Sequence, residues 1–146
     1  MCGIISRSFF IIKPEAFAVR KEIVNILNRR SNLTVVETKI IRLTEEDIDV
    51  IYLDDIGTPL LKAIKKHLSG KYVEAGIVEG FNAVIELRRI CGDCADPNLC
   101  EKNTIRHKFG LPEPVQYCNQ KFFLNAVHSA IESEVTVTLA WFNSKK

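Results

Sequence analysis

The chain has 146 residues, a length that suits one domain with a single hydrophobic core. Hydrophobic residues make up 47% of it and charged residues 26%, so a globular protein is expected rather than a disordered one. The formal net charge of +2 is too small to indicate a nucleic-acid or membrane partner, and any electrostatic function must come from local clustering.

The chain opens with a pattern of strand, helix and strand. Residues 6–13 form a short apolar, aromatic and β-branched run, which is typical of a central strand buried on both faces. Residues 14–30 have apolar positions spaced for one helical face, and arginines in the last turn, where the helix dipole favours them. Residues 32–43 are β-branched and partly alternating, which predicts a second strand.

Two helices are predicted next. Thr44 and Asp47 have the spacing of a variant capping box, which would open a short helix over residues 45–53. An amphipathic pattern over residues 58–70, stopped by Gly70, predicts the second of them.

A third strand is predicted over residues 71–80, and residues 81–92 have the pattern of a helix that Gly92 ends. From residue 91 to residue 120 the periodicity disappears, and prolines, asparagines and scattered charge predict a long loop. A loop of that length inside a compact domain is usually functional.

The C-terminal part completes the predicted order of elements. Residues 121–127 predict a short fourth strand, whereas residues 131–142 fit both a strand and a helix. The order predicts an α+β fold: a ferredoxin-like, four-stranded antiparallel sheet with helices packed on it and a long loop before the last strand. Nothing marks a boundary, so residues 1–146 are expected to form a single domain.

The chain carries no evident targeting or anchoring signal. No apolar run reaches the roughly 18–20 residues that span a bilayer, and charge and Pro14 interrupt the first segment. Cys2 stands where an N-terminal acylation motif would need glycine. We therefore expect a soluble, cytoplasmic protein whose five cysteines are free thiols.

Three basic residues, Lys13, Arg88 and Arg106, lie at predicted element ends or in the long loop. Each alone is typical of an ordinary surface residue. Together they suit a phosphate site, because arginine binds phosphate oxygens bidentately and lysine supplies a point charge. A histidine can hold a phosphoryl group between two half-reactions. The polar and aromatic residues that would complete such a site are Tyr52, Asn125 and His128.

Four segments, from about residue 7 to residue 142, resemble in the same order the signatures of nucleoside diphosphate kinases. They read RSFFIIKPEA, IVEGFNAVIELRRICG, NTIRHKFG and NAVHSAIES…LAWF. The Lys-Pro strand exit, the Thr-Ile-Arg and the Asn-x-x-His are specific in combination. The resemblance implies a ping-pong transfer of the γ-phosphate from a nucleoside triphosphate to a nucleoside diphosphate.

The resemblance also implies a role for each matching residue. His128 matches the phosphorylated histidine, and Lys13 matches the lysine that contacts phosphate and the ribose 3′-hydroxyl. Asn125 matches the asparagine on the sugar, and Tyr52 lines the site near the histidine.

Phosphate binding is implied for Arg88 and Arg106. Mg²⁺ is expected to bind mainly through the nucleotide phosphates, with no protein side chain as a metal ligand. Leu60 stands where the family has the phenylalanine that stacks on the base, so stacking becomes plain apolar contact, a loss of about 1 kcal/mol. Ala95 replaces a phosphate-contacting threonine, and residues 111–123 form an insertion.

The segment after His128 departs most from the family, which usually reads His-Gly-Ser-Asp-Ser. The supporting serine is missing or replaced by Ser129, and the position of the orienting glutamate falls near Val137. Glu132 and Glu134 are both candidates to replace that glutamate. We expect an active enzyme with weaker or altered nucleotide affinity. The alternative is a catalytically weakened nucleotide-binding or scaffold protein with the same fold.

Two further interpretations concern metal and assembly. Cys91, Cys94, Cys100 and His107 have a spacing that matches no common zinc knuckle, so scattered thiols are favoured over a structural zinc site. The resemblance implies a homo-oligomer of at least two chains, with a hexamer favoured and a tetramer or dimer as alternatives. Neither nucleic acid nor a membrane is expected as a partner.

Overall fold

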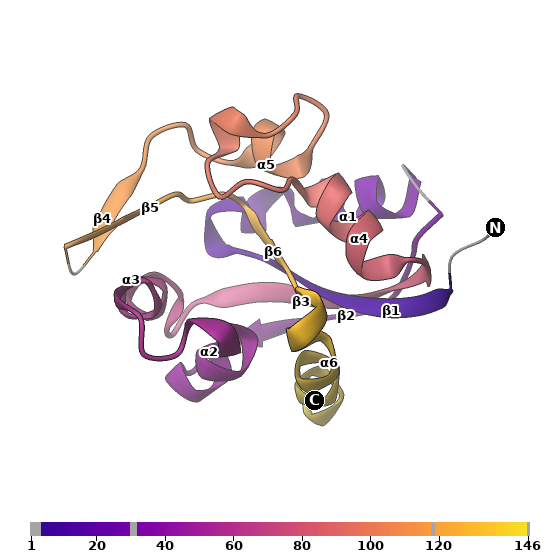
Figure 1. The fold of residues 1–146 in the computed structure, drawn as a ribbon, viewed down its shortest axis with the longest axis horizontal. Coiled ribbons are helices and arrows are strands. Elements are labelled where there is room, and N and C mark those ends of the chain that lie inside the picture. Colours follow the sequence, from indigo (N-terminus) through magenta and orange to yellow (C-terminus); the bar gives the residue numbers. More distant parts are fainter. Residues whose placement is uncertain (1–3, 30–31, 118, 146) are drawn as a thin grey trace.

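The computed structural model describes residues 4–29, 32–117 and 119–145. Four antiparallel strands form its main sheet, in the order β2-β3-β1-β6. With helices packed on this sheet, the α+β, ferredoxin-like prediction is confirmed (Figure 1). The strands are β1 (Ile5–Ile12), β2 (Thr34–Arg42), β3 (Tyr72–Phe81) and β6 (Val127–Ser129).

Strand β1 is central and buried on both faces, as predicted. Phe9 and Ile11 belong to one core cluster, and Phe10 and Ile12 to the other, and all four are fully buried. This division follows from the alternation of side chains along a strand. Strand β1 therefore separates two hydrophobic cores, one on each face of the sheet.

Each core is covered by its own group of helices (Figure 1). The first group comprises α2 (Glu45–Ile51), α3 (Pro59–Leu68) and α6 (Val135–Ser144). The second comprises α1 (Arg20–Arg29), α4 (Ala83–Cys91) and α5 (Ile105–Phe109). Short 3-10 helices join several elements: η1 (Pro14–Val19), η2 (Leu53–Asp55), η3 (Pro97–Leu99) and η4 (Glu132–Glu134). No helix among the described residues is long and apolar enough to cross a membrane.

Local capping explains where several helices begin and end. The capping box is present: Asp47 N–H donates to Thr44 Oγ1 at 3.2 Å, and Thr44 N–H donates to Asp47 Oδ2 at 2.9 Å. Gly92 ends α4 with a φ of 115°, a conformation that favours glycine. The helix predicted over residues 14–30 is divided, since η1 precedes α1.

The prediction of an unbroken loop over residues 91–120 is wrong. This segment contains η3, α5 and a strand, β4 (Val115–Tyr117). Helix α5 has only five residues, too few for a periodic pattern, and its start depends on Thr104, whose Oγ1 accepts from His107 N–H at 3.3 Å.

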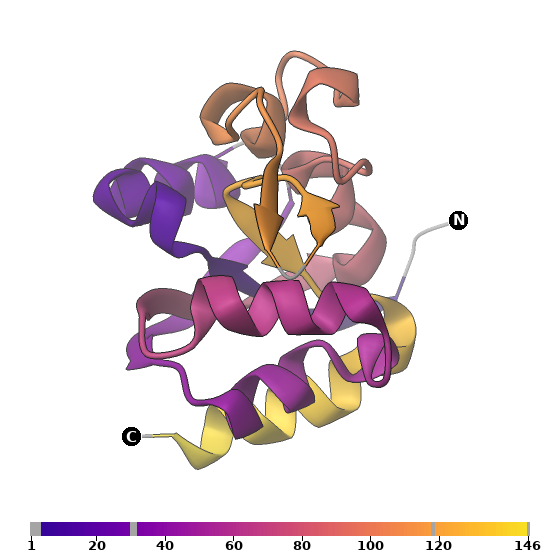
Figure 2. The same cartoon turned by 90° about the vertical axis from the view of Figure 1, so that its left-hand side faces the viewer.

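The strand predicted over residues 121–127 is two strands. Its first two residues belong to β5 (Gln120–Phe122), which pairs with β4 in a separate hairpin, and its last residue, Val127, begins β6, with residues 123–126 outside any strand. Ala126, with a φ of 73°, interrupts the extended backbone between them. Figure 2 shows the hairpin above α3. The ambiguous segment 131–142 is helical, as η4 and most of α6.

Candidate active site

His128 lies in the middle of β6, opposite Ile11 of β1. Its side chain is 13% exposed, and its ring packs on that of Tyr52 at the end of α2, with 4.4 Å between centroids. The histidine is thus held between the sheet and α2, with little freedom to rotate.

Lys13 and Asn125 meet beside this histidine, although 112 residues separate them in sequence. Lys13 follows β1, and its Nζ donates to Asn125 Oδ1 at 2.6 Å. Asn125 Nδ2 in turn donates to the carbonyl of Ala95 at 3.0 Å. Burial lowers the pKa of Lys13 to about 8; the charge of Glu15 opposes this shift and that of Arg106 adds to it.

Arg106, in the first turn of α5, is held by three backbone carbonyls, two from the loop after α4 and one from β6. Its Nη1 donates to Gly92 at 3.2 Å and Cys94 at 3.0 Å, while Nε and Nη2 both donate to Val127 at 3.3 and 3.1 Å. Four of its five N–H groups are therefore used within the protein. Arg106 fixes the residue immediately before His128.

Arg88 differs from Arg106 because its guanidinium is not held by hydrogen bonds to other described residues. It lies half-buried on α4. Its charge nevertheless acts on His128. This arginine is available for a ligand, whereas Arg106 serves mainly as a fixed charge.

The pKa of His128 is well below its usual range. Burial is the largest cause, and the charges of Lys13, Arg106 and Arg88 add to it, while a backbone hydrogen bond at Ile51 opposes them. The imidazole is therefore neutral at neutral pH, with a lone pair on one ring nitrogen.

Glu134, rather than Glu132, lies beside this histidine. The side chain of Glu134 is 4% exposed, and its Oε1 is 3.8 Å from His128 Nε2, which is too long for a hydrogen bond, while an ion pair would need a protonated ring. Glu132 is exposed. Ser129 follows His128 on the same strand, so their side chains point to opposite faces of the sheet.

Of the predicted site residues, Leu60 is the one that these contacts do not join to His128. It lies in the first turn of α3 and packs, partly buried, against the core cluster that includes Tyr52. A cavity of about 580 Å³ is lined by its neighbours Pro59 and Leu61. The contact between Leu60 and a base stays a prediction.

Two buried residues of this region were not predicted from the sequence. Glu15 Oε1 accepts a hydrogen bond from His67 Nε2 at 2.9 Å, and Oε2 accepts one from the N–H of Ala126 at 3.0 Å. The position of Glu15, two residues after Lys13, is a sequence signal that could have predicted its place in the site. His67 gave none, because a histidine near the end of an amphipathic helix fits an ordinary helical pattern.

The three cysteines of the segment predicted as a loop, Cys91, Cys94 and Cys100, are free thiols. Cys91 is buried on α4, and Cys100 Sγ donates to the carbonyl of Cys94 at 3.2 Å. His107 is exposed on α5. Cys2 and Cys118 lie outside the described residues.

The ferredoxin-like sheet carries a neutral histidine among three basic side chains. These features define a class of protein, the α+β domains suited to phosphate chemistry. The chain belongs to the nucleoside diphosphate kinase family, whose model, "Nucleoside diphosphate kinase", matches residues 6–145. The predicted family, and with it the prediction of an enzyme of that family, is confirmed.

Relatives and solved structures agree with this assignment. A nucleoside diphosphate kinase of Nitrosospira multiformis is 29% identical over 141 residues, covering 94% of this chain and 92% of the relative. The fold is similar to that of the Aquifex aeolicus nucleoside diphosphate kinase, with a TM-score of 0.80, 21% identity and 95% of both chains covered. It is also similar to a Borrelia burgdorferi enzyme with bound vanadate and ADP, with a TM-score of 0.72, 21% identity, and 93% and 85% covered.

Proposed function

We propose that the chain is a nucleoside diphosphate kinase that acts by a ping-pong mechanism through a phosphohistidine at His128. The observation that carries the proposal is the neutral imidazole of His128 beside the charges of Lys13, Arg88 and Arg106. A histidine is a nucleophile only with a free lone pair, and a phosphoryl group needs cations around it.

In the first half-reaction, the unprotonated nitrogen of His128 attacks the γ-phosphorus of a nucleoside triphosphate. The P–N bond forms, the bond to the bridging oxygen breaks, and the diphosphate leaves with both bonding electrons. A terminal phosphate oxygen of a second nucleoside diphosphate then attacks the phosphohistidine, which restores neutral His128. No net proton is gained or lost by the ring.

Arg88 would bind phosphate oxygens directly, because its guanidinium is available. Lys13 would contact phosphate and the ribose 3′-hydroxyl, with Asn125 on the sugar, and their mutual hydrogen bond of 2.6 Å already sets their relative positions. Arg106 would contribute charge near the transferred group, and Tyr52 would hold the ring of His128 in place.

Mg²⁺ would arrive on the nucleotide, where it neutralises charge on phosphate oxygens. Among the residues that the structure describes, there is no group of three or more His, Cys, Asp or Glu side chains that could hold a metal ion. We also propose one domain over residues 1–146, a homo-oligomer with a hexamer favoured, and a cytoplasmic location. The absence of nucleic-acid and membrane partners stays a prediction.

Transfer of label from [γ-³²P]ATP tests the proposal. Wild-type protein should form an acid-labile, base-stable phosphoprotein and pass the label to dTDP, whereas His128→Ala should do neither. His107→Ala, at an exposed histidine, is the matched control and should behave as wild type. Equal labelling of His128→Ala and wild type would overturn the assignment.

The same assay tests the alternative of a weakened binding or scaffold protein. That alternative is favoured by the distance of 3.8 Å between His128 and Glu134, which leaves the ring without a hydrogen bond to that carboxylate. It predicts that ADP binds, as seen by calorimetry, while no label reaches dTDP.

A further inference from the structure

Ala126, two residues before His128, has a left-handed backbone conformation. Its φ of 73° is one that residues with a side chain rarely adopt. Such a conformation persists only when its surroundings enforce it. Here the carbonyl of Ala126 accepts from the N–H of Lys13 at 2.8 Å, and its own N–H donates to Glu15 Oε2 at 3.0 Å.

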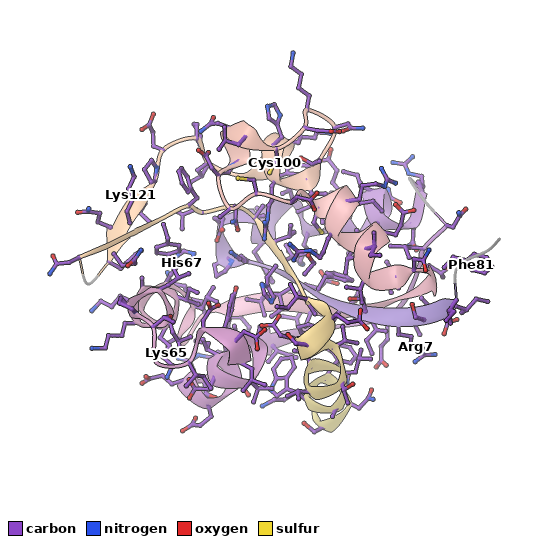
Figure 3. The ribbon with its side chains drawn as sticks, in the orientation of Figure 1. Arg7, Lys65, His67, Phe81, Cys100 and Lys121 are labelled. Carbon is purple, nitrogen blue, oxygen red and sulfur yellow. The ribbon has the colours of Figure 1, made fainter. Side chains whose placement is uncertain are left out.

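The carboxylate that holds this turn is itself anchored. Glu15 Oε1 accepts from Nε2 of His67, and both side chains are at least nine-tenths buried. The rings of Tyr117 and Phe122 lie 6.0 and 5.8 Å from that of His67. The side chain of His67, on α3, therefore faces the β4–β5 hairpin, where water is largely excluded (Figure 3).

Glu15 is also the negative charge nearest in sequence to Lys13. Burial by itself would raise the pKa of Glu15, but the hydrogen bond from His67 and the charge of Lys13 lower it, so the carboxylate is ionised. In return, Glu15 opposes the fall in the pKa of Lys13. The other charged or titratable groups that face this pair are Arg106, His128 and Tyr52.

We propose that Glu15, anchored by His67, is a positioning residue for phosphoryl transfer. It fixes the turn at Asn125–Ala126 that sets the start of β6, and it keeps a negative charge beside Lys13. Neither residue needs to touch the nucleotide. The proposal rests on the proposed function of His128 and adds the two residues that hold that site in its active arrangement.

The variant Glu15→Gln keeps the shape of the side chain and removes its charge. Because Lys13 then loses its nearby anion, the alkaline limb of the kcat/KM profile should move to lower pH by about one unit, with a loss of about fivefold at pH 8 that approaches about tenfold above pH 9. Glu15→Asp restores the charge and should move the limb back towards wild type. Glu22→Gln, at an exposed glutamate paired with Lys108, is the matched control and should leave the profile unchanged.

A second measurement does not depend on transfer. Hydrogen exchange at the amide of Ala126 should be at least about tenfold faster in Glu15→Gln and in His67→Phe than in wild type, because the acceptor is weakened or released. NMR titration of the Lys13 amino group should show a lower pKa in Glu15→Gln. His67→Phe keeps an aromatic ring against Tyr117 and Phe122, so packing is largely retained.

The outcomes separate the two proposals. If wild type transfers no phosphate, the function of His128 is wrong, and the exchange and titration data still decide the role of Glu15. If wild type is active but Glu15→Gln keeps the alkaline limb and the exchange rate of Ala126, the role of Glu15 is wrong. Should Glu15→Gln fail to fold, an unchanged exchange rate in His67→Phe overturns the proposal equally.

Discussion

His128 illustrates how a residue acquires its chemistry from distant neighbours. Its pKa is lowered first by burial and then by Lys13, Arg106 and Arg88, which come from three different parts of the chain. The same environment that keeps the ring neutral supplies the cations that a transferred phosphoryl group needs. In the proposed mechanism, the nucleophile and the cations that stabilise the transferred group therefore belong to one cluster of side chains.

That arrangement makes stability depend on pH. In the unfolded chain His128 gains a proton below about pH 6.5, whereas in the folded chain it stays neutral to lower pH. The free energy of unfolding should therefore fall as pH falls below 6.5, by up to about 1.4 kcal/mol per pH unit from this group. Urea denaturation between pH 5 and pH 8 should show this slope reduced in His128→Gln; equal slopes would contradict the prediction.

The two arginines of the site should respond differently to the same substitution. Arg106→Lys cannot reproduce the contacts to Gly92, Cys94 and Val127, so it should lose about 1–3 kcal/mol of stability. Arg88→Lys breaks no such contact, so its stability should stay close to wild type while nucleotide affinity falls. Denaturation and ADP calorimetry on both variants provide the test, and equal stability losses would refute the distinction.

The site residues differ in how far the sequence could predict them. His128, Lys13 and Asn125 stand in motifs whose order along the chain is informative. Glu15 and His67 meet across 52 residues, and only the packing of α3 near the end of β1 brings them together. Motifs record which residues are present, but not which buried groups support them.

At the scale of elements, periodicity predicted the strands and helices that bury a face in a hydrophobic core. It missed the short elements that depend on local hydrogen bonds. Strands β1 and β3 and helices α3 and α4 bury whole faces, so their patterns are visible in the sequence. Helix α5 depends on one threonine cap. The β4–β5 hairpin depends on its own cross-strand pairs and on contacts with α3, which no local pattern encodes.

Asp47 joins two helices, and of the two aspartates on α2 its substitution should lower the free energy of unfolding more. Its carboxylate accepts from Thr44 N–H, and from Trp141 Nε1 at 2.9 Å, and it pairs with Lys145 at 2.6 Å, which ties α2 to α6. Asp47→Ala should therefore lower stability by about 2–3 kcal/mol, from the lost cap and an unpaired indole N–H.

Asp49, on the same helix, provides the control. Its side chain is 41% exposed and pairs with Lys65 across the surface, so Asp49→Ala should change stability by less than about 0.5 kcal/mol. Thermal unfolding of both variants measures the difference. Similar losses in the two would show that the tie between α2 and α6 contributes little.

At the scale of the whole molecule, the edge strand β2 of the main sheet stands out. Strand β1 and strand β3 are internal, whereas β2 forms one edge and pairs only with β3 among the described strands. Val36 and Ile40 of β2 are 43% and 52% exposed. A long edge strand with exposed apolar side chains is a ready surface for pairing with another chain.

The proposed homo-oligomer should therefore use this edge. The double variant Val36→Lys and Ile40→Lys places two charges on it without disturbing a buried side chain, so the oligomer should dissociate while the fold is retained. Sedimentation velocity gives the mass, and circular dichroism gives the fold. Ile85→Lys, at a 72% exposed position on α4, is the matched control and should keep the wild-type mass. A change of mass in the control alone would place the interface on α4 instead of β2.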